Sequence, residues 1–263
     1  MKKILIALFL LLLIDLNLFA EDSIDASDPT KVYTFVGLGM KYTDYTNDES
    51  MIELRTVGNI GLTPNDMILF EVGYGTHNGS KIEGSSSAIT NSRMRWFHLF
   101  EMDYSITSGY RGWATQIDLQ LAGGLKGTDS ENVLSVGALP AFGINENWSF
   151  FLPLNLVNSW DKDFTKHNGV ALNVSPLVVY TPKWWNESYV QIWPEYTYFV
   201  SGELQDKGSA TLDITFGGAL SEMAWWALSY KKNYDVHLQA PSRSSDSGLN
   251  NYQNIFLNFT RYF

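Results

Sequence analysis

Residues 254–263, "NIFLNFTRYF", alternate between two kinds of side chain. The odd positions Ile255, Leu257, Phe259 and Phe263 are apolar, and only Arg261 interrupts them. The even positions mix asparagine and threonine with aromatic rings. Strict alternation is typical of a β-strand with two unlike faces. A strand that is apolar on one face, mixed on the other and aromatic at its end suits lipid on one side and water on the other.

The opposite end of the chain, "MKKILIALFLLLLIDLNLFA" (1–20), has the pattern of a secretory signal peptide. Lys2 and Lys3 precede an unbroken apolar run from Ile4 to Ile14. This run of about eleven residues is shorter than the roughly twenty that a membrane-spanning helix needs. We therefore expect residues 1–20 to be removed from the mature protein.

Composition excludes several classes of protein. The chain contains no cysteine, so disulfides and thiolate metal sites are excluded. Its net charge of −10 argues against a nucleic-acid partner. Charged residues make up only 17% and aromatic residues 14% of the chain, which fits a protein in which every second strand residue faces lipid. Because no linker or low-complexity tract divides the sequence, we expect one domain.

Segments of about ten residues with a two-residue period recur along the rest of the chain. In "WATQIDLQL", for example, Trp113, Ile117 and Leu121 share one face while Gln116 and Asp118 share the other. The segments are 32–42, 50–60, 67–75, 92–104, 113–122, 133–143, 148–157, 169–180, 189–199, 211–220, 224–234 and 253–263. They predict an all-β fold, a single antiparallel barrel of about twelve strands, with ten to fourteen possible.

Short and long connections alternate between these segments. Short ones such as "GLTPND" and "NEN" contrast with long polar ones such as "HNGSKIEGSSSAITN". Short periplasmic turns and longer external loops are the asymmetry expected of a membrane barrel. Tryptophans recur beside the short turns, and we predict that they form an aromatic belt at one membrane face. The predicted belt consists of Trp113, Trp148, Trp184, Trp185, Trp225 and Trp226.

Taken together, the signal peptide, the alternating segments, the asymmetric connections and the terminal "RYF" resemble bacterial outer-membrane β-barrels of the small porin or channel type. The resemblance implies a signal peptide at 1–20, a short periplasmic segment at 21–31 and a transmembrane barrel at 32–263 in the bacterial outer membrane. It also implies contact with outer-membrane lipids and lipopolysaccharide, and insertion by the barrel-assembly machinery, with no cofactor and no metal. The assembly signal would lie in the last strand, at Ile255, Leu257, Phe259 and Phe263.

In such a barrel, the alternation of side chains also predicts which residues line the lumen. The predicted lining comprises Glu53, Arg55, Glu71, Arg93, Arg95, Asp118, Glu195 and Asp213, with Glu101 and Asp103 nearer the periplasm. Adjacent strands place Arg93 and Arg95 across from Glu71. These charges either create a transverse field at a constriction or form a neutralising network that fills a narrow barrel, and the sequence leaves both open.

The function that fits these features is a channel for passive diffusion of small hydrophilic or amphipathic solutes, without catalytic residues. One alternative is an outer-membrane lipid hydrolase of the phospholipase or deacylase type, which needs a nucleophile near a base. His and Ser lie two positions apart in some barrel enzymes of this type, a spacing absent after His77, His98, His167 and His237. Another alternative is a barrel that displays its loops and transports nothing.

Overall fold

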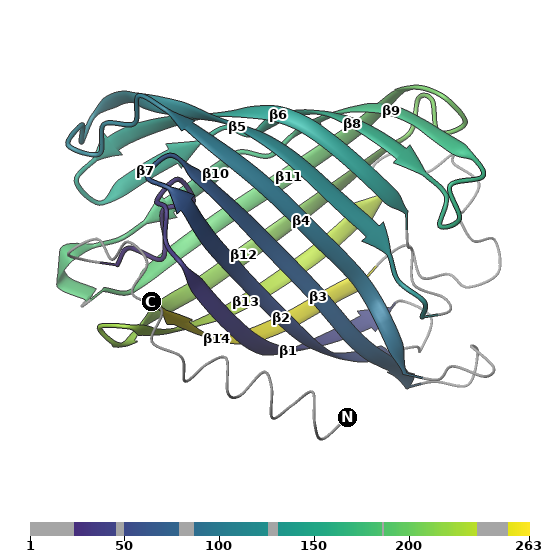
Figure 1. The fold of residues 1–263 in the computed structure, drawn as a ribbon, viewed down its shortest axis with the longest axis horizontal. Helices are drawn as coiled ribbons and strands as arrows, with labels where there is room; N and C mark the ends of the chain where they lie inside the picture. The colour runs from purple at the N-terminus through teal and green to yellow at the C-terminus, as the bar shows by residue number, and fades with distance from the viewer. Residues whose placement is uncertain (1–23, 46–49, 79–86, 126–130, 186, 236–251) are drawn as a thin grey trace.

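The computed structural model describes residues 24–45, 50–78, 87–125, 131–185, 187–235 and 252–263. The predicted signal peptide, residues 1–20, lies outside the described residues. Long antiparallel strands run obliquely around one interior and close into a barrel (Figure 1). In the part of the chain that the structure describes, no helix has the length and apolar character to cross a membrane.

The barrel is built from fourteen strand pieces and one short 3-10 helix, η1 (Lys183–Trp185). The strands are β1 (Phe35–Tyr45), β2 (Ser50–Thr63), β3 (Asp66–Asn78), β4 (Ala88–Phe100), β5 (Gly109–Ala122), β6 (Asn132–Asn145), β7 (Trp148–Phe151), β8 (Leu154–Trp160), β9 (His167–Val174), β10 (Leu177–Tyr180), β11 (Tyr189–Ser201), β12 (Gly208–Ser221), β13 (Ala224–Asp235) and β14 (Tyr252–Tyr262).

These pieces amount to the twelve antiparallel strands predicted from the sequence. Pro153 separates β7 from β8, which both pair with β6, and Pro176 separates β9 from β10, which both pair with β11. A proline has no N–H to donate to the ladder, so each of these long strands is interrupted at that residue. The interruptions leave the barrel order unchanged.

The last strand closes the barrel, because β14 pairs with both β13 and β1. Its register joins Tyr252 to Tyr45 and Tyr262 to Phe35. The two faces of this strand are as the alternation predicted: Ile255 and Phe259 are half exposed on the outside, whereas Asn258 is buried on the inside. Closing a sheet on itself removes the unpaired edges that would otherwise remain.

The two ends of the barrel differ. At one end, which we call the turn end, residues 64–65, 146–147 and 222–223 make short connections between neighbouring strands. At the other end, the loop end, residues 161–166 and 202–207 make longer ones. The interior near the turn end is packed with apolar side chains from inward positions, among them Met67, Phe97, Leu99, Leu139 and Phe151. The polar part of the lumen therefore begins farther from the turn end.

Candidate functional site

Charged side chains at inward positions of β1–β5 form one connected network. Lys41 Nζ lies 3.1 Å from Glu53 Oε2, and Arg55 Nε lies 2.5 Å from Glu53 Oε1. Arg55 then reaches the next strand, where Nη1 donates to Glu71 Oε2 at 2.8 Å. The glycine at position 73, beside Arg55 in the register, makes room for the Glu53 carboxylate, because a Cβ there would lie 2.7 Å from the Glu53 carboxyl carbon.

The network continues through two arginines on β4. Arg93 holds Asp118 on β5 with two nitrogens, and Nε lies 2.9 Å from Oδ1. Arg95 Nε lies 3.2 Å from the same carboxylate, and Arg93 Nη1 lies 3.7 Å from Glu71 Oε1. Asp118 thus accepts from both arginines, an arrangement in which charge-assisted bonds fix the side chains in place.

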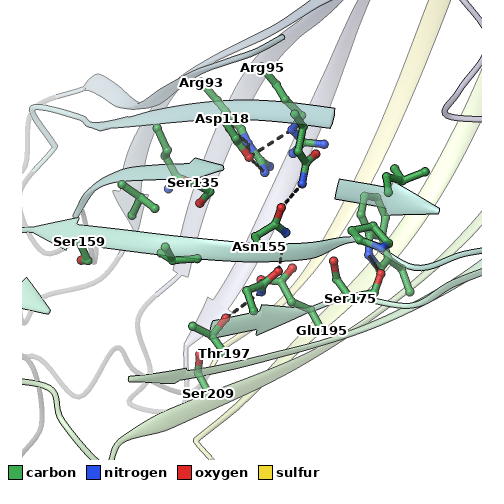
Figure 2. Close-up of a pocket in the computed structure, with 18 of the residues that line it drawn as sticks. Arg93, Arg95, Asp118, Ser135, Asn155, Ser159, Ser175, Glu195, Thr197 and Ser209 are labelled. Atoms are coloured by element: carbon green, nitrogen blue, oxygen red, sulfur yellow. Dashed lines mark hydrogen bonds and ion pairs between the residues drawn. The ribbon is translucent and has the colours of Figure 1, made fainter. Parts of the chain in front are cut away.

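Amide side chains extend this network across the other half of the barrel (Figure 2). Gln116 donates to Asn155, Asn155 Nδ2 donates to Asn173 Oδ1 at 2.9 Å, and Asn173 Nδ2 donates to Glu195 Oε1 at 3.2 Å. Gln116 and Asn155 are not on neighbouring strands, because β6 lies between them with Gly137 in register with both. A Cβ on Gly137 would lie 2.1 Å from Asn155 Oδ1, so this position needs glycine.

We call the ion pairs and the amide row together the polar girdle. Asp213 on β12 and Lys231 on β13 face each other in the register and complete the circle toward Asn254 on β14. The sequence analysis did not include Lys41 or Lys231 in the lumen lining. The two-residue alternation could have placed both lysines in the lumen. The residues two positions before and after each lysine, on the same face of the strand, are polar or glycine.

Two cavities lie on either side of the girdle arginines. A cavity of about 230 Å³ is lined by the polar side chains of Arg95, Asn155 and Glu195 and by the apolar side chains of Leu139, Leu177 and Trp193. A second cavity of about 210 Å³ lies toward Leu69, Trp225 and Tyr262. Arg93 and Arg95 line both cavities, so their guanidinium groups separate them.

Most of the predicted lining residues come together in the girdle. Glu53, Arg55, Glu71, Arg93, Arg95 and Asp118 share one ion-pair network, Glu195 lies at the end of the amide row, and Asp213 lies beside Lys231. The placement of Glu101 and Asp103 on an inward strand face is wrong. The strand predicted at 92–104 ends at Phe100, and both residues are exposed in the turn that follows, where Glu101 has a φ of 50° and Asp103 accepts from Ser105.

The predicted aromatic belt is largely at the outer rim of the turn end. Trp148 packs on Tyr180 at 4.4 Å between ring centroids, Trp113 stacks on Phe100 at 4.3 Å, and Trp184 and Trp185 lie in η1. The prediction is wrong for Trp225, which is 5% exposed and packs inside the barrel against Tyr33, Tyr189 and Tyr262. Trp226 follows it on the strand, and consecutive strand residues point to opposite faces, so only Trp226 can face outward.

Comparison with solved structures places this geometry among known proteins. An outer-membrane channel from Pseudomonas putida F1 is 12% identical with a TM-score of 0.59, covering 92% of this chain and 100% of its own. NanC porin is 5% identical with a TM-score of 0.59, and KdgM porin in complex with disordered oligogalacturonate is 9% identical with a TM-score of 0.53. Both alignments cover 87% of this chain, and they cover 100% of the NanC chain and 99% of the KdgM chain.

The fold is that of an outer-membrane β-barrel. No protein-family model matches the sequence, and no match exists among the curated proteins. Identities this low mean that the likeness of this barrel to the porins lies in its architecture, and its function has to be argued from the side chains in its lumen.

Proposed function

We propose that the protein is an outer-membrane channel through which small hydrophilic or amphipathic solutes diffuse passively. The observation that carries this proposal is the cavity of about 230 Å³ within a closed barrel, whose lining combines polar and apolar side chains. A solute with hydroxyl, amide or paired charged groups could exchange its hydration for Asn155, Asn173 and Glu195 while its apolar part lies near Trp193.

The charge balance of the girdle supports a preference for neutral or dipolar solutes. Its cations, Lys41, Arg55, Arg93, Arg95 and Lys231, are matched in number by its carboxylates, Glu53, Glu71, Asp118, Glu195 and Asp213. Because most of these charges are paired within the wall, the lumen carries no large excess of either sign. We therefore expect the lumen to favour neither anionic nor cationic solutes strongly.

The first prediction is that the purified protein, reconstituted in a planar bilayer, produces discrete conductance steps. A water-filled lumen with charged walls conducts ions, whereas a barrel filled with side chains does not. The same preparation after heat unfolding is the control and should be silent. A folded barrel that conducts neither on its own nor after removal of residues 24–31, described below, would contradict the channel function.

The same recordings also test the two alternative functions, a lipid hydrolase and a barrel that only displays its loops. The His98 ring lies on the outer face between Trp96 and Phe100, and its Nδ1 is 2.9 Å from Asp66 Oδ1. An imidazole next to a carboxylate is part of a hydrolytic site only when a nucleophile contacts the other ring nitrogen. Esterase activity on phospholipid without conductance would favour the enzyme, and neither activity would favour the display barrel.

The proposal includes a location and an orientation. The turn end would face the periplasm and the loop end the outside, with outer-membrane lipids and lipopolysaccharide around the apolar exterior and removal of residues 1–20 before insertion. The barrel-assembly machinery would act on β14, whose Ile255, Leu257 and Phe259 face outward. Phe263, in contrast, is 7% exposed, and its backbone N–H donates to Thr34 O at 2.9 Å.

The second prediction is that deletion of Phe263 lowers the amount of assembled barrel far more than it lowers synthesis. The deletion removes both the terminal ring and the hydrogen bond that ties the end of β14 to the residue before β1. Heat-modifiable mobility on a gel measures assembly, and immunoblotting of whole cells measures synthesis. Phe263→Tyr is the matched control and should assemble normally. Normal assembly of the deletion variant would show that the C-terminus does not act as an assembly signal.

A further inference from the structure

The residues that precede β1 lie inside the barrel. The sequence analysis predicted a short periplasmic segment at 21–31, but in its described part Ser27 is 2% and Thr30 1% exposed. The next residues are equally enclosed, since Val32 packs against the apolar cluster of Met67 and Phe97. Alternation had no bearing on these residues, because they are not in a strand. Residues 24–31 therefore lie within the turn end of the barrel.

This segment is hydrogen-bonded to the wall at separate places. Gln191 Nε2 on β11 donates to Ser27 O at 2.8 Å, and Tyr104 Oη in the turn after β4 donates to Thr30 O at 2.8 Å. Asn59 Nδ2 on β2 donates to Tyr33 O at 2.6 Å. Because β11 lies across the barrel from β2 and from the turn that follows β4, a chain that contacts all three spans the lumen.

The segment also has a compact shape of its own. The Asp25 carboxylate accepts from the Ser27 N–H at 3.1 Å and from its hydroxyl at 2.5 Å. Asp28 accepts in the same way from the Thr30 N–H at 2.9 Å and from its hydroxyl at 2.5 Å. Two consecutive turns of this kind fold the chain back on itself, so that it fills space across the lumen.

Cavities lie on both sides of the segment. Pro29 lines the cavity of about 230 Å³, which extends past the girdle to Ser159 and Ser209 near the loop end. A cavity of about 160 Å³ on the turn-end side is lined by Asp25, Asp28 and Glu146. The segment therefore stands between the solute cavity and the turn end of the barrel.

We propose that residues 24–34, the luminal plug, close the turn end of the channel and move aside when a solute passes. This inference rests on the proposed channel function. Residues 32–34 are the fixed end of the plug, because Phe263 N donates to Thr34 O at 2.9 Å and Gly61 N donates to Thr34 Oγ1 at 3.2 Å. Residues 24–31 are the part that moves, held to the wall through the Ser27 and Thr30 carbonyls.

The carboxyl group of Asp28 makes plug docking sensitive to pH. Burial, and after it the neighbouring charge of Asp25, raise the pKa of Asp28 from 3.8 to about 6, despite the opposing effects of Thr30 and Lys31. From the surrounding wall, Tyr104, Arg111 and Glu146 face the same cavity. In a plug released from the wall, the pKa of the Asp28 carboxyl would be lower. Asp28 therefore binds its proton more tightly when the plug is docked. Docking is then strongest below about pH 4 and weakens as the pH rises to about 6.

The third prediction tests the movement directly. The chain has no cysteine, so Ser27→Cys with Gln191→Cys introduces a single pair, which a short bifunctional methanethiosulfonate can bridge. Bridging should abolish conductance steps, and reduction should restore them. Each single cysteine variant, treated alike, is the control and should continue to conduct. Unchanged conductance after complete bridging would show that the plug does not need to move.

Two further variants test closure and its pH dependence in the same recordings. Deletion of residues 24–31, which leaves the fixed end in place, should give larger steps that do not depend on pH between 4 and 7. Asp28→Asn should keep the open fraction low throughout that range, whereas the open fraction of the unaltered chain should rise by up to about a hundredfold. The control Asp163→Asn, in an exposed loop, should behave as the unaltered chain.

These outcomes separate the two proposals. Steps of equal size from the deletion variant and the unaltered chain would overturn the plug and leave the channel function standing. Silence of every folded variant, including the deletion, would overturn both. Heat-modifiable mobility establishes that each variant is folded before it is recorded. An open fraction that varies with pH equally in Asp28→Asn and in the unaltered chain would overturn the role of Asp28.

Discussion

Replacing Glu53 with glutamine is expected to lower the free energy of unfolding by about 3–5 kcal/mol, the range found when one partner of a buried ion pair is removed. The Glu53 side chain is fully buried between Lys41 and Arg55, which are themselves only 15% and 14% exposed. Glutamine keeps the shape but not the charge, so both cations lose their nearest carboxylate. Urea unfolding in detergent, followed by tryptophan fluorescence, measures the loss.

A matched control lies on the surface of the same protein. Glu203 forms an ion pair with Lys166, but these side chains are 52% and 56% exposed. Glu203→Gln should therefore change the free energy of unfolding by less than about 1 kcal/mol, because water and salt screen exposed pairs. Equal effects of the two substitutions would show that the interior of the barrel is wet enough to solvate Lys41 and Arg55.

The double substitution of Arg93 and Arg95 by alanine is expected to make the channel more selective for cations. The two arginines separate the lumen cavities, and their removal leaves the Asp118 carboxylate without its partners and Glu71 with Arg55 alone. Fixed negative charge in a confined lumen attracts cations, and two long side chains no longer fill the narrow part. Reversal potentials in a salt gradient measure the selectivity, and the step size should hold or rise.

The stability of the same double variant separates the two roles left open by the sequence. The structure contains the neutralising network, because Arg93 and Arg95 both contact Asp118, and it also places both arginines at the cavities. We expect a less stable barrel that still conducts. Lys166→Ala with Lys183→Ala removes two charges outside the lumen and should alter neither property. An unchanged reversal potential in a stably folded Arg93 and Arg95 double variant would place neither arginine in the ion path.

Local sequence was sufficient for everything that depends on the two-residue period of a strand. It predicted the number and approximate ranges of the strands, since each must present an apolar face outward over its length. It also predicted the inward direction of Glu71 and Arg93 and their pairing in the register. It failed where the strand ends, at Glu101 and Asp103, because Glu101 adopts a positive φ of 50° and ends β4 at Phe100, which makes the turn to β5 longer than alternation alone suggests.

The tertiary structure decided what depends on contacts between distant strands. Arg93 faces Glu71 in the register, yet its close partner is Asp118, because a long side chain in a sheared barrel reaches a diagonal neighbour. The Gln116 and Asn155 contact joins residues two strands apart in direct register, because Gly137 between them has no side chain.

The sequence by itself determined the barrel, because a period of two is a property of each strand alone. Only closure of the barrel decided what its interior holds. Trp225 lies inside and Trp226 outside according to the register of β13, and residues 24–34 lie in the lumen because the walls of β2 and β11 offer hydrogen bonds to their carbonyls. Such contacts join residues far apart in the chain, and no local pattern encodes them.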